Sequence, residues 1–181
     1  MSDYTVHPIS ENDLKLVLRW RNSDRVHSQM LSDHLLTWDE HYQWYCHIKE
    51  NPVPRNLIFS HKERPIGYIG YTEYDEERSQ CSPGAYLGEV DVPIDAGLVL
   101  FSFCLEYAFS ILGMQRLETS VFVNNRRAKK INEYLGYEYI PGKDMVCLKN
   151  GKEVMVQRYE LTHAQWDLRK EQIPMEGVKI L

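Results

Sequence analysis

Apolar and polar residues near the start of the chain alternate first with a strand period and then with a helical period. Residues Tyr4 to Pro8 alternate as a short strand. Ser10 to Asp13 has the pattern of a capping box and is followed by apolar residues at helical spacing. A second box at Thr37 to Glu40 opens another such segment, which ends before Pro52. The N-terminal part therefore predicts one strand and then two helices.

The pattern changes to strand character after these helices. Asn56 to Ser60 and Arg64 to Tyr74 are rich in β-branched and aromatic residues. Ala85 to Val92 is a third segment of this kind, with Gly84 and Pro93 at its ends. We expect the three strands to form an antiparallel meander.

Helices and strands alternate in the C-terminal half. Gly97 to Leu112 is apolar nearly all round, which predicts a helix packed deeply against a sheet. A strand over Arg116 to Val123 and a basic helix over Arg126 to Leu135 follow. Two closing strands are expected to pair around Asn150-Gly151, and a tail helix begins at about residue 162. The closing strands are Tyr137 to Ile140 and Glu153 to Leu161.

The composition fits one globular domain over residues 1–181. The chain is 43% hydrophobic and 26% charged, which excludes disordered and collagen-like classes. Its net charge of −5 argues against general nucleic-acid binding. The four cysteines lack C-x-x-C spacing, so we expect neither a disulfide framework nor a metal site. With no signal-peptide pattern and no apolar stretch of about 18 residues, we expect a cytoplasmic protein without a membrane partner.

The order of elements and two local motifs resemble the GCN5-related N-acetyltransferases over nearly the whole chain. One motif is Asn125 to Ala128, of the form N-x-x-A, followed by Gly136-Tyr137; the other is the helix-to-strand junction Tyr107 to Leu117. The resemblance implies an α+β fold with a central, mostly antiparallel, twisted sheet of about seven strands, flanked by helices and splayed between its fourth and fifth strands. It also implies acetyl-CoA as co-substrate, with Asn125 beside the pantetheine arm.

The loop before the long helix departs from the family's diphosphate pattern, R/Q-x-x-G-x-G/A. It keeps one glycine and has neither Arg nor Gln, and Asp95 is an unfavourable neighbour for an anion. Free amides at a helix N-terminus bind phosphate without that pattern. The basic residues of the later helix are either a solvated face or partners of the CoA 3′-phosphate. The expected cofactor-binding residues are Val90, Val92, Ala96, Gly97, Leu98, Val99, Asn125 and Lys130.

A narrower pattern consists of Arg21-Asn22, Met30, His41 with Gln43-Trp44, and Tyr86 to Gly88 with Pro93. It resembles the N-acetyltransferases of nucleotide-linked 4-amino-sugars, of the pseudaminic-acid pathway type. That resemblance implies a substrate cleft lined from the N-terminal helices and the meander. A guanidinium such as that of Arg21 matches phosphate bidentately, although an exposed helix charge is an equal alternative. The expected substrate-binding residues are Arg21, Met30, His41, Thr72 and Tyr86.

Acetyl transfer requires a neutral amine and a protonated leaving thiol, which makes bases and acids worth identifying. The candidate bases are His41, Glu73 and Glu89, with solvated carboxylates and a structural histidine as the alternatives. The family's usual tyrosine position is occupied by Asn132, while Tyr134 points to another face of the helix. An Asn132-held water is favoured over a displaced Tyr134 or protonation by solvent.

The narrower resemblance implies transfer of acetyl to the 4-amine of a UDP-linked 4-amino-4,6-dideoxy sugar, in making a surface or flagellar glycan. Two alternatives remain: acetylation of protein N-termini, as for ribosomal proteins, and a catalytically silent CoA-binding module. The expected partner is the nucleotide amino sugar, and the chain could form a homodimer.

Overall fold

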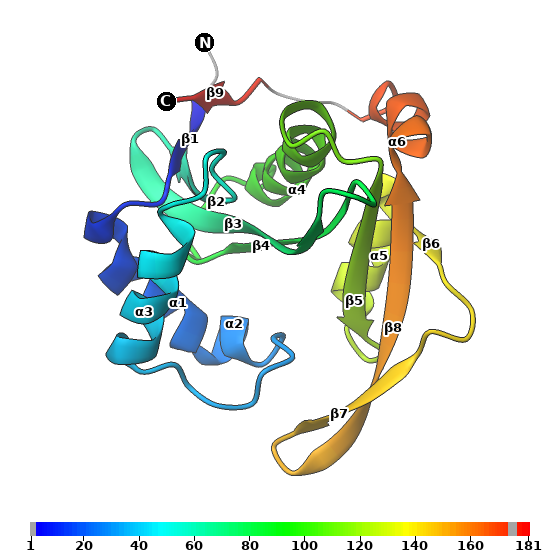
Figure 1. Cartoon of the computed structure of the whole chain (residues 1–181), viewed down its shortest axis with the longest axis horizontal. Helices are drawn as coiled ribbons and strands as arrows, with labels where there is room; N and C mark the ends of the chain where they lie inside the picture. The colour runs from blue at the N-terminus through cyan, green and yellow to red at the C-terminus, as the bar shows by residue number, and fades with distance from the viewer. Residues whose placement is uncertain (1–2, 174–176) are drawn as a thin grey trace.

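A twisted sheet runs through the molecule with helices on both faces, as the computed structural model in Figure 1 shows. The structure describes residues 3–173 and 177–181. Among these, nine strands join in the order β6-β8-β5-β4-β3-β2-β1-β9, with β7 added to β8. The strands are β1 (Tyr4–Pro8), β2 (Asn56–His61), β3 (Arg64–Asp75), β4 (Gln80–Leu87), β5 (Arg116–Phe122), β6 (Glu138–Tyr139), β7 (Met145–Lys149), β8 (Lys152–Thr162) and β9 (Lys179–Ile180). The helices are α1 (Leu14–Asn22), α2 (Asp24–His27), α3 (Trp38–Ile48), α4 (Ala96–Glu106), α5 (Arg126–Leu135) and α6 (His163–Lys170).

Local capping explains where several helices begin. At each of three capping boxes, the first side chain and the side chain three residues later satisfy each other's backbone amides, which would otherwise be unpaired at a helix start. The first box opens a short 3-10 turn that runs into α1, and the last opens the tail helix α6, as expected. The three boxes are Ser10 with Asp13, Thr37 with Glu40, and Thr162 with Gln165.

Strand alternation divides the interior into two cores on opposite faces of the sheet. Leu57 and Phe59 of β2 belong to the large core that α4 covers. Ile58, between them, packs with Val17 and Trp20 of α1. Since side chains of a strand alternate between faces, α1 and α4 cover opposite faces. Each face can therefore carry its own binding site.

The parallel neighbours β4 and β5 separate after a short contact. They pair only at Gln80 with Arg116 and at Cys81 with Leu117, and then diverge in Figure 1. The remaining residues of β4 therefore present backbone groups to a gap in the sheet. This is the splay between the fourth and fifth strands that the family resemblance predicts.

The third meander strand was misplaced by the sequence prediction. It covers Gln80–Leu87 rather than Ala85 to Val92. Beyond Leu87 the chain turns toward α1 and packs against Trp20. Gly88 lies so close to the Trp20 ring that an added Cβ would be 2.0 Å from it, and the Glu89 carboxylate accepts a hydrogen bond from the Trp20 indole. Pro83 is tolerated in the strand because it lies past the last pair with β5, at an edge.

The C-terminal hairpin also differs from the prediction. The partner of β8 at the Asn150-Gly151 turn is β7, whereas β6 pairs farther along β8, at Glu138 with Glu160. β8 is long enough to pair with both. The long helix predicted over Gly97 to Leu112 is α4 followed by a π-helical turn over Tyr107–Ile111. Within the described part of the chain, no helix is long and apolar enough to cross a membrane.

Candidate active site

A groove on the α4 face opens beside the gap in the sheet. Its cavity has a volume of about 510 Å³ and lies between the end of β4, the start of α4 and one face of α5. Gly97, Leu98 and Phe101 line it from α4. One helical face of α5, with residues three or four apart, lines the other side: Arg127, Lys130, Ile131 and Tyr134. We refer to this cavity as the α4–α5 groove.

The start of α4 offers main-chain donors to this groove. The Ala96 amide donates to Pro93 and the Val99 amide donates to Asp95, at 3.1 and 3.0 Å. The amides of Gly97 and Leu98 lie between them in the first turn, where a helix has no internal acceptors. The Asp95 carboxylate is held aside by the Tyr4 hydroxyl, which donates to it at 2.9 Å. Asp95 therefore does not cap these amides, and the helix start favours an anion.

The predicted cofactor residues fall into three environments. Gly97, Leu98, Val92 and Lys130 line the groove. Val90 is 79% exposed in the loop beyond β4 and is not among the groove-lining residues, because the strand ends before it. The remaining three have structural contacts: Ala96 and Val99 are buried in the large core, and Asn125 caps α5 by accepting from Ala128.

The two α5 candidates for the acid point to different faces, as expected. Tyr134 lines the groove, and its ring lies under the Arg169 guanidinium. Asn132 is not among the groove-lining residues. Its side-chain nitrogen is buried and has no hydrogen-bond partner among the described residues. The role of either residue as an acid stays a prediction.

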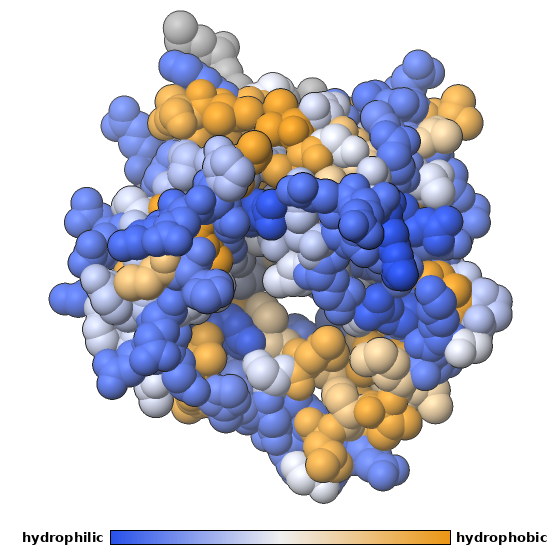
Figure 2. Space-filling model, viewed as in Figure 1, coloured by the Kyte–Doolittle hydropathy of each residue, from blue (hydrophilic) through white to orange (hydrophobic). Residues whose placement is uncertain are grey.

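A second depression lies on the opposite face of the sheet. Figure 2 shows the molecule hollowed between the α1–α3 region and the β5–β8 arm; we call this the acceptor hollow. Arg21 of α1 lies beside Tyr68 and Tyr86 there, and burial lowers its pKa while the two hydroxyls oppose that shift. Its Nη2 donates to Ser32 at 2.6 Å, and its buried Nη1 has no partner within the described residues. An unpaired buried guanidinium nitrogen is available to an acceptor oxygen.

Two paired glycines leave a patch of the sheet without side chains in this region. Gly70 of β3 pairs with Gly84 of β4, on the same sheet face as Tyr68 and Tyr86 by alternation. A side chain at Gly84 would meet only the Gly70 carbonyl oxygen, at 3.9 Å, whereas one at Gly70 would meet the Tyr68 hydroxyl at 2.5 Å. The sheet floor at Gly84 is therefore open space. Sequence reasoning missed it, because Gly84 was interpreted as a strand terminator.

A charged cluster forms on the β5–β8 arm. Arg158 donates to Glu118 at 2.7 Å and to Glu73 at 3.3 Å, and Ser120 contributes a further acceptor at 3.2 Å. The Arg158 hydrogen bond holds the pKa of Glu118 below its ordinary value. Leu117 faces the α4 core, so Glu118 and Ser120 face the hollow side of the sheet. Glu73 is thus an ion-pair partner rather than a free carboxylate.

The other two candidate bases are also engaged. His41 is 3% exposed, and its Nε2 lies 3.1 Å from the Leu14 carbonyl oxygen at the contact between α3 and α1. Burial lowers the pKa of His41. The Glu89 carboxylate binds Trp20 and Arg19 at 2.8 and 3.0 Å, in a loop rather than on the predicted strand face. These contacts disfavour a proton-transfer role for either residue.

Of the remaining substrate candidates, Thr72 and Met30 lie on different elements. Thr72 of β3 is exposed, on the same sheet face as Tyr68, and donates to the Ser82 carbonyl at 3.3 Å. Met30 is half-buried in the segment between α2 and α3. Tyr86 is adjacent to Tyr68, with ring centroids 5.3 Å apart. Arg21, Tyr86 and Tyr68 are therefore brought together, and Tyr68 is the member that sequence reasoning missed.

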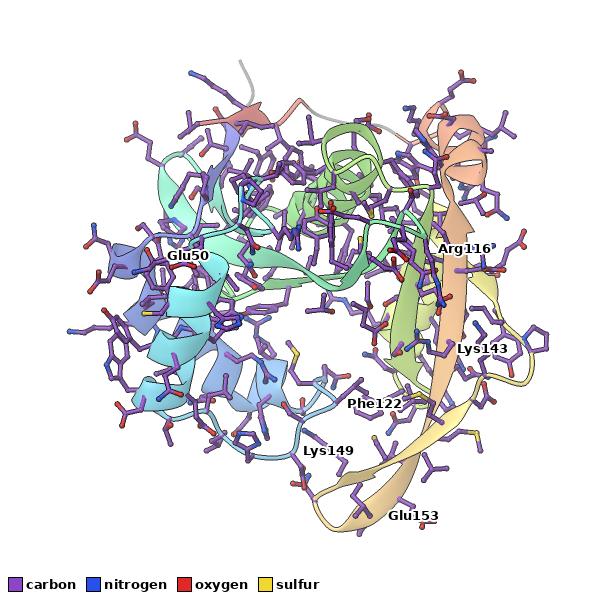
Figure 3. The ribbon with its side chains drawn as sticks, viewed as in Figure 1. Glu50, Arg116, Phe122, Lys143, Lys149 and Glu153 are labelled. Carbon is purple, nitrogen blue, oxygen red and sulfur yellow. The ribbon has the colours of Figure 1, made fainter. Side chains whose placement is uncertain are left out.

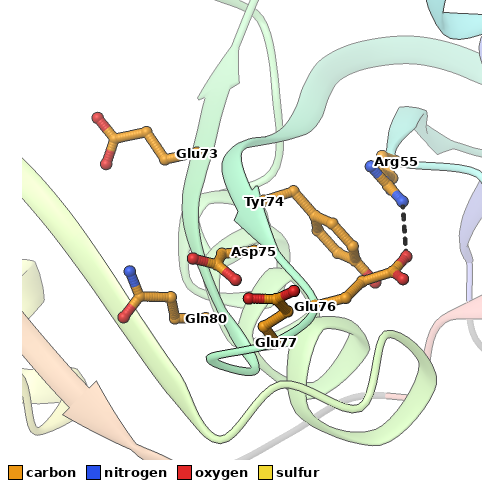
Figure 4. A pocket seen from close by; sticks show the side chains of 7 residues that line it. All are labelled: Arg55, Glu73, Tyr74, Asp75, Glu76, Glu77 and Gln80. Atoms are coloured by element: carbon orange, nitrogen blue, oxygen red, sulfur yellow. Dashed lines mark hydrogen bonds and ion pairs between the residues drawn. The ribbon is translucent and has the colours of Figure 1, made fainter.

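An acidic recess opens at the β3–β4 turn (Figure 4). It has a volume of about 650 Å³ and is lined mostly by carboxylates, with Arg55 bonded to Glu76 at its rim. Such a surface repels diphosphates. Within the described ranges, no group of three or more His, Cys, Asp or Glu could hold a metal ion. The α4–α5 groove is therefore the better place for a polyanionic cofactor.

Known proteins resemble this chain in sequence and in fold. The chain is 25% identical to acetyltransferase PseH of Campylobacter jejuni over 144 residues, which cover 78% of this chain and 88% of that protein. The structure of this chain superposes on a spermidine N-acetyltransferase from Vibrio cholerae, solved with CoA and spermine. The TM-score is 0.82 at 17% identity, over 91% of this chain and 98% of the other.

A second solved structure gives the same fold. It is yncA, an acetyltransferase from Salmonella typhimurium with its cofactor acetyl-CoA, at a TM-score of 0.71 and 16% identity, covering 89% of this chain and 94% of the other. At these identities the structural matches show the fold alone. The family model for the acetyltransferase (GNAT) domain matches residues 4–138, which is most of the chain. The protein therefore belongs to the GNAT acetyltransferase family.

Proposed function

We propose that this acetyltransferase moves acetyl from acetyl-CoA to the 4-amine of a UDP-linked 4-amino-4,6-dideoxy sugar, in making a surface or flagellar glycan. The observation that carries the proposal is Arg21, whose buried Nη1 lies near Tyr68 and Tyr86 and has no hydrogen-bond partner in the part of the chain that the structure describes. A nucleotide diphosphate supplies the oxygen acceptors that this guanidinium lacks.

The α4–α5 groove fits the acetyl-CoA side of the reaction. The amides of Gly97 and Leu98 are suited to a diphosphate, and Arg127 and Lys130 add positive charge across the groove. CoA or acetyl-CoA is bound by two proteins of the same fold. The adjacent gap between β4 and β5 gives an extended arm a route from the groove toward the acceptor hollow.

The acceptor hollow fits a sugar nucleotide on its other side. The bare floor at Gly84 gives a ring room to lie against backbone, and the aromatic rings of Tyr68 and Tyr86 flank that floor. Sequence similarity to acetyltransferase PseH and the resemblance to 4-amino-sugar N-acetyltransferases support the same class of acceptor.

The proposed reaction needs mainly alignment from the protein. The neutral amine nitrogen attacks the thioester carbon, a C–N bond forms, the C–S bond breaks, and the amine proton passes to solvent while solvent protonates the thiolate. His41, Glu73 and Glu89 are all engaged in other contacts, which is why we assign proton removal to water. Placement of two reactants lowers a barrier by about 7–11 kcal/mol in well-oriented systems.

The test is CoA thiol release with a panel of amines. We expect turnover with the UDP-linked 4-amino sugar, and little with spermidine or a peptide beginning with serine. Arg21→Met should raise the KM for the sugar nucleotide by roughly tenfold or more, because a charge-assisted bond to phosphate is lost. Arg19→Met, on the same helix but with a side chain 68% exposed, is the matched control. Turnover confined to the peptide or the polyamine would overturn the proposal.

A further inference from the structure

The tip of the β7–β8 hairpin is hydrogen-bonded to the segment between α2 and α3, and we call this set of contacts the clasp. Lys149, the last residue of β7, donates from Nζ to the carbonyl oxygens of His27 and Ser32, at 3.0 and 2.8 Å. Its Nζ also lies 3.7 Å from a carboxylate oxygen of Asp33. The amide of Asn150 donates to both Asp33 oxygens at 3.0 Å. Figure 3 shows Lys149 beside this segment.

The burial of Lys149 makes this an unusual use of a lysine. The residue is 8% exposed, although lysines are rarely buried unless paired. A buried ammonium is costly unless its donors are satisfied, and two carbonyls with one carboxylate satisfy them here. Removing Lys149 would leave the His27 and Ser32 carbonyls without this donor. The contact therefore holds the hairpin and the segment together across a sequence separation of more than a hundred residues.

One residue of this segment, Ser32, contacts the proposed acceptor-binding residue Arg21. Ser32 offers its carbonyl to Lys149 and its hydroxyl to Arg21, at 2.8 and 2.6 Å. Farther back, Gln29 accepts from Asn125 at 2.6 Å, which ties the same segment to the start of α5. The position of the Arg21 guanidinium thus depends on a segment that Lys149 fixes from the far side of the hollow.

We propose that Lys149 is a positioning residue for the acceptor: it locks residues 27–33 across the hollow so that Ser32 orients Arg21. The functional part of this inference rests on the proposed function, whereas the structural part does not. Lys149 touches neither reactant in this account. Its loss should loosen the segment and weaken acceptor binding, while the α4–α5 groove on the other face keeps its affinity for acetyl-CoA.

The first test follows the segment itself. Hydrogen exchange of residues 27–36 should rise in Lys149→Met by about tenfold or more relative to the wild type, because the hydrogen bonds from Lys149 hold this segment in place and a held segment opens less often. Lys152→Met is the matched control, since Lys152 lies opposite Lys149 in the strand pairing but is exposed. Exchange that is unchanged in Lys149→Met, or equally raised in Lys152→Met, would overturn the clasp.

The second test asks whether Lys149 acts through Ser32. Binding of UDP is measured by calorimetry for Lys149→Met, Ser32→Ala and the double variant. We expect each single change to weaken UDP by roughly tenfold and the double change to be no worse than Lys149→Met alone. Additive losses would contradict the route through Ser32. A wild type that binds no UDP would refute the proposed nucleotide and the acceptor role of Lys149 together, while the exchange result would still decide the clasp.

Discussion

At the residue scale, function in this protein depends on which polar groups are left unsatisfied by the fold. His41, Glu73 and Glu89 have chemistry suited to a base, but each is engaged in a packing or ion-pair contact. Arg21 differs, because one of its buried donors has no partner among the described residues. A sequence reveals residue types but not these pairings, since the partners come from distant segments.

Adding a side chain at Gly84 tests whether the bare floor belongs to the acceptor site. Gly84→Val should raise the KM for the sugar nucleotide by about tenfold or more, since methyl groups would occupy space needed by the ring. The KM for acetyl-CoA and the melting temperature should hardly change, because the added Cβ meets only the Gly70 oxygen at 3.9 Å and valine suits a strand. An unchanged acceptor KM would place the acceptor elsewhere.

A pH experiment separates packing from catalysis at His41. Burial lowers its pKa in the folded state below the ordinary value of 6.5. Below pH 6.5 the unfolded chain therefore takes up a proton that the folded chain resists, so stability is lost as pH falls. His41→Gln should flatten this loss in chemical denaturation curves and leave the pH dependence of kcat in place.

The exposed His47, on the same helix as His41, provides the control substitution His47→Gln. This variant should keep the wild-type pH dependence of stability. A loss of the acid limb of the kcat profile in His41→Gln alone would restore His41 as a base, because that limb reports protonation of the base.

At the element scale, the proposed cofactor site lies between the start of one helix and the face of another. Gly97 and Leu98 supply amides, and α5 supplies Arg127 and Lys130 at helical spacing. The sequence pattern for such a site is loose, because main-chain amides need no particular side chain.

The charge on α5 can be tested with donors that differ in the diphosphate. The double change Arg127→Gln and Lys130→Gln should raise the KM for acetyl-CoA by roughly tenfold, with a larger effect at low ionic strength. It should hardly affect S-acetylpantetheine, which lacks the diphosphate. Arg126→Gln removes a like charge from an exposed residue of the same helix that does not line the groove. Equal losses with both donors would show that the helix face does not bind the diphosphate.

Most elements of the fold could be predicted from the sequence, and the failures have physical reasons. Capping boxes and apolar periodicity located the helices and the first strands. The sequence misplaces the end of β4 because Gly88 and Glu89 leave the strand to contact Trp20. Trp20 is 69 residues from Glu89 in the chain, so no local pattern reveals this contact. Gly97, which the sequence predicts at the cofactor site, does line the α4–α5 groove, but its role there stays a prediction. The partners of Lys149 depend on tertiary contacts that no local pattern records.

At the scale of the whole molecule, the sheet separates two depressions and is open between them. The α4–α5 groove lies on one face of the sheet and the acceptor hollow on the other. Between them, β4 and β5 are no longer paired after Cys81. In the proposed reaction, the two reactants approach from opposite sides of the sheet and meet at the gap, without sharing an entrance. The clasp at Lys149 closes the hollow on the side away from the gap.

A crystal structure with CoA and UDP bound together tests this arrangement most directly. We predict the CoA diphosphate within hydrogen-bond distance of the Gly97 and Leu98 amides, the thiol in the gap between β4 and β5, and a UDP phosphate on Arg21. CoA bound away from the start of α4, or both ligands on the same face of the sheet, would contradict the account.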